Sequence, residues 1–201
     1  MGMEIAQVFL SRHEDLRSAM EDLVACPETE WRARPHGLNP MTWLVWHMAR
    51  AEDSGLNRLV FDRPQVLDDP ATRWPDRMRV PLRHHGSTMS SGEVDALNAQ
   101  ADIGAVRAYS VAVAERTRAL VRQLDPASLD RDVPPPHLRR VLYDEGMLRP
   151  GYPWPEEPPL YSGQARGELL FMFGVTHNFY HWGELLAVHS CLDAPHALSP
   201  A

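Results

Sequence analysis

The chain has 201 residues, a hydrophobic fraction of 44%, a charged fraction of 23% and a formal net charge of −7 at neutral pH. This is the composition of a soluble globular domain, and the length suffices for a single domain, residues 1–201, with a buried core. The acidic balance and the lack of a basic stripe argue against a nucleic-acid partner, and no run of 18 apolar residues predicts a membrane span.

All 20 basic residues are arginine, so mechanisms that need a Schiff-base lysine or a phosphate-loop lysine are excluded. The two cysteines, Cys26 and Cys191, form no CxxC motif and predict no disulfide framework. Residues 1–10 lack the basic segment and long apolar core of a secretory signal, so we expect a cytoplasmic protein.

Two long helices are predicted in the first third of the chain. Residues 3–25 repeat apolar side chains at helical spacing, and Pro27 follows the end of that helix. A second helix is expected to open at Asn39 and Pro40, an N-cap residue followed by proline at the first helical position, and to run to about Phe61.

The next segment, residues 62–100, contains four prolines that interrupt regular structure, and only the stretch from Ser91 resembles the start of a short helix. A third long helix is predicted over residues 103–124. Residues 126–159 are rich in proline, so neither 134–136 nor 152–159 is expected to be helical. A fourth, largely apolar helix is predicted over 164–191.

These elements predict an all-α fold, a four-helix bundle. The connection between helices 2 and 3 is long enough to cross the whole bundle, so these two helices need not be antiparallel. A second, Pro-rich connector joins helices 3 and 4. Its aromatic residues, Tyr152 and Trp154 among them, indicate a packed cap over one end of the bundle.

Three histidines are the candidate functional residues. His177 and His181 are four residues apart and therefore share one face of the fourth helix. His47 lies in an equally apolar part of the second helix. A buried imidazole without a partner is costly, and neutral imidazole is the commonest metal ligand in proteins. The alternative for each of these three histidines is a purely structural role, as a core histidine bonded to a backbone carbonyl, and that alternative stays open here.

The layout resembles the DinB-like superfamily of metal-dependent helical bundles, which includes thiol S-transferases. The resemblance rests on the segment from Trp43 to Asp53 in the second helix, on the segment from His177 to Leu186 in the fourth, and on the residues around Trp31. It implies an up-down-down-up bundle and one divalent metal, zinc or nickel, held by His47, His177 and His181. It also implies a homodimer.

Three imidazole ligands leave coordination positions open, as in catalytic metal sites. The leading hypothesis is a transferase that conjugates a low-molecular-weight thiol, mycothiol being one candidate, to small electrophiles. The alternatives are a metal-dependent hydrolase and a non-catalytic, stress-related bundle that binds a metal or a small ligand. The sequence names neither the metal nor the substrate.

Two further side chains are candidates at this site. Glu184 lies three residues after His181 and is expected to orient a ligand histidine or to act as a base. Arg50 is placed at the pocket rim, where it would bind a carboxylate of the thiol cosubstrate, with a surface ion pair as its alternative.

The remaining histidines and aromatic residues are given structural roles. His84 and His85 are expected to face solvent from the crossover, and the other histidines away from the motif are expected on the surface or in loops, namely His13, His36, His137 and His196. His189 is expected on nearly the same face as His181 but two turns away. Phe179, Tyr180 and Trp182 are interpreted as core packing.

Overall fold

The computed structural model describes residues 4–152 and 157–193. Within those ranges no β-strand forms, and the only bridge is an isolated antiparallel pair, Asp132 with Ala165. None of the helices described is both long and apolar enough to cross a bilayer. The predicted all-α class is confirmed.

Four long helical segments make the bundle. They are α1 (Ile5–Leu23); α3 (Met41–Glu52), which continues through the π-helical η2 (Asp53–Val60); α6 (Ile103–Arg122); and α8 (Arg166–Phe171), which continues through the π-helical η6 (Met172–Thr176) into α9 (His177–Asp193). The second helix starts one residue later than expected, because Pro40, and not Asn39, occupies its N-cap position.

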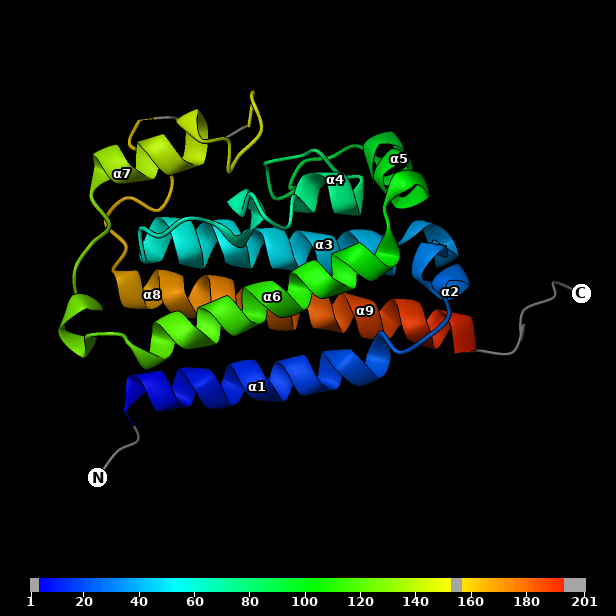
Figure 1. Cartoon of the computed structure of the whole chain (residues 1–201), viewed down its shortest axis with the longest axis horizontal. Coiled ribbons are helices and arrows are strands. Elements are labelled where there is room, and N and C mark those ends of the chain that lie inside the picture. Colours follow the sequence, from blue (N-terminus) through cyan, green and yellow to red (C-terminus); the bar gives the residue numbers. More distant parts are fainter. Residues whose placement is uncertain (1–3, 153–156, 194–201) are drawn as a thin grey trace, which may run out of the picture.

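The helices follow the predicted order up, down, down, up (Figure 1). α1 and α9 run in one direction, and α3 and α6 run in the other. α3 packs against α6 and α9, and α1 packs against α9 and α6. The long crossover between the second and third helices makes this order possible, since α3 and α6 lie parallel.

Short helices build the connectors: α2 (Glu28–Arg32) and η1 (Pro35–Gly37); η3 (Val66–Asp68), α4 (Trp74–Met78) and α5 (Ser91–Gln100); η4 (Pro126–Ser128), α7 (Pro135–Arg139) and η5 (Arg140–Asp144). The crossover covers the bundle, because α5 contacts α3 while η3 and α4 contact α6. α5 begins at a capping box in which Ser90 and Glu93 bond each other's backbone N–H.

One expectation about the second connector is wrong. Pro135 and Pro136 were expected outside any helix, yet α7 begins at Pro135. The first N–H groups of a helix have no partner within the helix, so a proline there loses no hydrogen bond and its fixed φ suits the first turn. The connector packs Leu138 and Leu142 into the apolar cluster that also holds Phe9 and Leu56. Tyr152 packs against this cluster; Trp154 lies outside the described residues.

Two glycines allow the π-helical turns to pack closely. A Cβ atom at Gly174 would lie 2.6 Å from Cε2 of Phe9, and one at Gly55 would lie 2.6 Å from ring carbons of Phe173. Both distances are well below van der Waals contact, so the rings occupy the space that any larger residue would need. η6 leads directly into His177, and π-helical turns of this kind are frequent at functional sites.

Candidate metal centre

Three histidines from two helices meet inside the bundle. His47 comes from α3 and is 2% exposed; His177 and His181 come from the first turns of α9. The ring centroids lie 4.9 Å apart for His47 and His177, 4.7 Å for His47 and His181, and 4.5 Å for His177 and His181. Within the part of the chain that the structure describes, these are the residues that could together hold a metal ion.

The tautomer of His47 is fixed by its surroundings. Its Nδ1 lies against the backbone carbonyl of His85. A carbonyl oxygen only accepts hydrogen bonds, so Nδ1 must carry the proton and Nε2 of the neutral ring keeps its lone pair. The ring also stacks on Trp43, at 4.5 Å between centroids and 7° between planes. His47 is therefore held on one face and at one nitrogen, with Nε2 free to coordinate.

His181 is oriented in the same manner. Its Nδ1 donates to Oε2 of Glu184 at 2.9 Å, one turn further along α9. This bond leaves Nε2 of His181 as the atom available to a metal. Glu184 thus lies where the sequence placed it, beside a candidate ligand histidine. It also lines a hollow of about 220 Å³ together with Leu38, Asn39 and Val188.

The spacing of the nitrogens fits a single ion. Nε2 of His177 lies 3.1 Å from Nε2 of His47, and the candidate ligand atoms of all three histidines lie within 4.8 Å of one another. Two nitrogens bound at 2.0–2.1 Å to one tetrahedral zinc ion would be about 3.3 Å apart. The donor set and its geometry therefore fit one divalent metal.

His47 and His177 are held in the neutral form that metal coordination requires. Burial, with the proximity of His177 as the next cause, keeps the pKa of His47 well below its usual value. Burial likewise lowers the pKa of His177 to about 4, and His181 adds to the effect. Imidazolium cannot bind a metal, so at neutral pH these rings offer lone pairs and not protons.

A buried carboxylate anchors α9 next to the metal centre. Glu52, at the end of α3, accepts hydrogen bonds from Nδ2 of Asn178 at 2.8 Å, from Nη2 of Arg17 at 2.8 Å and from Nε2 of His13 at 2.9 Å. Asn178 is the residue after His177, so this contact fixes the rotation of α9 that turns its two histidines toward His47. Burial raises the pKa of the Glu52 carboxyl, but Arg17 and His13 outweigh it and hold the pKa well below its usual range.

The expectation for His85 was wrong. Its side chain is 7% exposed, its carbonyl oxygen orients His47, and its ring centroid lies 5.7 Å from that of His47. Its Nδ1 accepts from the backbone N–H of Ser87, which places the ring proton on Nε2. Burial lowers its pKa to about 3. The sequence around it shows no helical periodicity, so only the folded crossover reveals this contact.

Of the other histidines that were expected at the surface or in loops, some are buried and some are exposed. His13 was expected at the surface, but it is fully buried against Glu52, on the apolar face of α1. His137 is partly buried and donates from Nε2 to the carbonyl oxygen of Leu59 at 3.0 Å, whereas His36 is exposed as expected. His196 lies outside the described residues. Helical spacing alone could have identified His13, four residues after Phe9.

The rim position expected for Arg50 is wrong. The side chain is fully buried and donates to the hydroxyl of Tyr109 at 2.8 Å, to Gln65 at 3.0 Å and to Asp53 at 3.3 Å. The alternative, an ion pair with an acidic residue, is correct in its partner type but not in its surface location. A guanidinium with these partners ties α3 to α6 and to the crossover, and both of its Nη groups are bonded, while its buried Nε–H has no acceptor among the described residues.

The aromatic residues beside the second motif also differ from expectation. Tyr180 is 69% exposed and Phe179 is 36% exposed, so neither is core packing, while Trp182 is partly buried against the apolar core. Because His177 and His181 turn inward, the residues between them on the opposite side of α9 must face outward.

Comparison with known families agrees with this architecture. The chain matches the family model described as the DinB superfamily over residues 11–185, and it therefore belongs to that superfamily. The matched range includes all three histidines, the whole of α3 and α6, and parts of α1 and α9. No curated protein and no solved structure matches the chain.

Proposed function

We propose that this DinB-superfamily chain is a metal-dependent thiol S-transferase, which joins a low-molecular-weight thiol to a small electrophile. The observation that carries the proposal is the convergence of three imidazoles, two of them oriented by hydrogen bonds, with no fourth side-chain ligand among the described residues. A closed structural zinc site has four protein ligands, whereas a site with three leaves room for a reactant. Mycothiol is the first thiol to test.

In this proposal the three histidines and their hydrogen-bond partners have different roles. His47, His177 and His181 would hold the metal, while the His85 carbonyl and Glu184 keep the coordinating nitrogens turned inward. A divalent metal bound there, zinc or nickel, would supply a positive charge that lowers the pKa of a coordinated thiol. The thiol proton passes to solvent, the sulfur forms a bond to the electrophilic carbon, and the leaving group departs with its electron pair.

The contacts of Glu184 favour this chemistry over hydrolysis. A metal-dependent hydrolase needs a general base that reaches the attacking water. Glu184 is the acidic residue nearest in sequence to the candidate ligands on α9, and its Oε2 already accepts from His181. Orienting the histidine is therefore the role that its position supports.

The test uses protein purified without a histidine tag, so that the metal content is its own. Metal analysis of the wild type and of His47→Ala comes first, with about one metal per chain expected for the wild type only. The metal-loaded protein is then incubated with mycothiol and monochlorobimane. Conjugation well above the His47→Ala background supports the transferase, while a metal without conjugation by this or other thiols leaves a metal-binding bundle.

The oligomeric state belongs to the same proposal. A homodimer remains a prediction from the family, and sedimentation of the metal-loaded protein at several concentrations would test it.

A further inference from the structure

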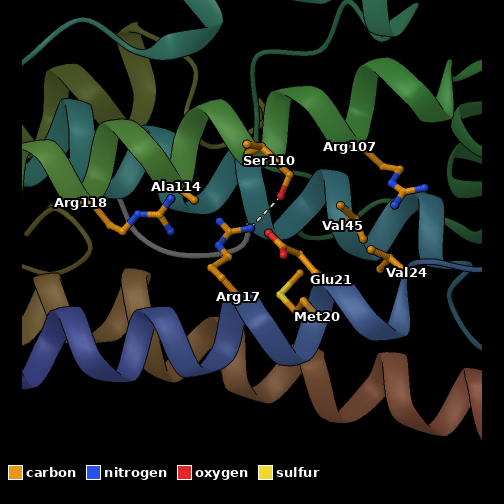
Figure 2. A pocket seen from close by; sticks show the side chains of 10 residues that line it. Arg17, Met20, Glu21, Val24, Val45, Arg107, Ser110, Ala114 and Arg118 are labelled. Atoms are coloured by element: carbon orange, nitrogen blue, oxygen red, sulfur yellow. Dashed lines mark hydrogen bonds between the residues drawn. The ribbon is translucent and has the colours of Figure 1, made fainter.

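A second cavity lies on the other side of α3 from the histidines. It has a volume of about 300 Å³ and opens between α1 and α6 (Figure 2). Val45 of α3 lines it, whereas the side chain of His47 leaves α3 on the far side, because two residues along a helix correspond to a rotation of about 200°. The cavity is therefore separate from the candidate metal centre.

Apolar side chains form much of the wall. Met20 comes from α1, Val24 caps the C-terminus of α1, Val45 comes from α3, and Val111 and Ala114 come from α6. The cavity volume, equal to about ten water molecules, is at the lower end of the range of small-molecule sites. A wall of this kind favours the body of a small apolar ligand over water.

Three arginines reach into the same space. Arg17 extends from α1, and Arg107 and Arg118 approach from α6 on either side of it (Figure 2). Glu21 is the one acidic residue in the wall. Arg118 pairs with Glu14 at 3.2 Å. Arg107 lies over the ring of Trp31 at 5.7 Å, and among the described residues it makes no ion pair. Glu52 and Glu14 already neutralise Arg17 and Arg118, so Arg107 is the arginine of this wall that lacks an ion pair among the described residues.

Arg17 provides a separate sign of a missing acceptor. Its side chain is about nine-tenths buried, with Nη1 donating to Ser110 at 2.7 Å and Nη2 to Glu52 at 2.8 Å. Its Nε–H is buried and has no acceptor among the residues that the structure describes. A buried donor without an acceptor is costly, and it is uncommon in proteins unless a ligand or water supplies one.

We propose that this cavity binds a small monoanion with an apolar body, such as a medium-chain or aryl carboxylate. The carboxylate lies between Arg17 and Arg107, where charged donors bind anions in planar, paired hydrogen bonds. The apolar body lies against Met20, Val24 and Val45. Neither a cation nor a neutral lipid of the same size would satisfy these arginines.

The experiment titrates the metal-loaded full chain with octanoate and, as the uncharged control, with octanol. Protein labelled at its methionine and valine methyl groups reports binding at Met20, Val24 and Val45 by NMR. We expect saturable shifts at these methyl groups with octanoate and at least tenfold weaker binding of octanol, because the alcohol makes no charge-assisted bond.

Two variants and a matched control locate the site. Arg107→Gln removes the arginine without an ion pair and should weaken octanoate binding about tenfold. Val111→Trp adds bulk at a position that is 48% exposed, and it should block binding while the fold is kept. Arg116→Gln removes another exposed arginine of α6 outside this cavity and should change nothing. Equal binding of octanol, shifts confined to other methyl groups, or affinity unchanged in Arg107→Gln would each overturn the proposal.

Discussion

Removal of the buried charge of Glu52 is the most informative perturbation of this fold. Its carboxylate is fully buried and serves three donors, from Arg17, His13 and Asn178. Glu52→Gln keeps the size of the side chain but offers one oxygen where the carboxylate offers two, and its NH₂ group opposes a donor. Arg17 is then left nine-tenths buried without its counter-charge.

The magnitude follows from that burial. Breaking a buried ion pair by removing one partner costs about 3–5 kcal/mol. For a domain of this length each kcal/mol lowers the melting temperature by about 2–4 °C, so the expected decrease is roughly 6–20 °C. In urea unfolding, the same loss of stability should appear as a lower midpoint concentration, with the dependence of the unfolding free energy on urea concentration unchanged.

A double variant tests the cause. If the loss comes from an uncompensated charge, Arg17→Met together with Glu52→Gln should recover much of it, since neither charge then remains. Losses of stability that simply add in the double variant would refute this reasoning.

The pH dependence gives a second check, because the pKa of Glu52 is lower in the folded chain than its usual 4.5. Its contribution is complete above pH 4.5 and is lost as the pH falls further, so Glu52→Gln should show a shallower loss of stability in acid than the wild type.

Three other predictions address the site and its support. Glu184→Gln should weaken zinc binding tenfold or more in a chelator competition, and an unchanged affinity would contradict its orienting role. Gly174→Ala should lower the free energy of unfolding by about 1–3 kcal/mol through overpacking, offset in part by the gain of about 1 kcal/mol in helix propensity. Gly183→Ala, whose Cβ meets nothing within 4 Å, gains only the helix propensity and should therefore stabilise the protein. Equal melting temperatures of these two variants would disprove the close packing at Gly174. Tyr109→Phe should cost about 1–3 kcal/mol in urea unfolding, because Asp53 loses a donor at 2.6 Å; wild-type stability would show that another donor replaces it.

Some of the site was within reach of sequence reasoning because it depends on local spacing. His177 and His181 share a helix face by their separation of four residues, and Glu184 follows one turn later. The neighbours of His47 are apolar, so its burial was predictable as well. These inferences need only helix geometry, and a helix imposes it wherever it forms.

Other contacts join segments that no local rule relates. His85 orients His47 from a crossover without helical periodicity, and Arg50 is buried because Tyr109 and Gln65 happen to enclose it. Pro135 begins a helix although proline usually interrupts one.

The sequence by itself determined the four helices, their apolar faces and the pair of histidines on α9, since these follow from residues a few positions apart. Only the tertiary structure decided that His47 meets that pair, that Glu52 fixes the rotation of α9, and that arginines of α1 and α6 share a cavity. The physical reason is that packing between distant segments depends on the shape and charge of both partners at once, which periodicity along a single segment does not encode.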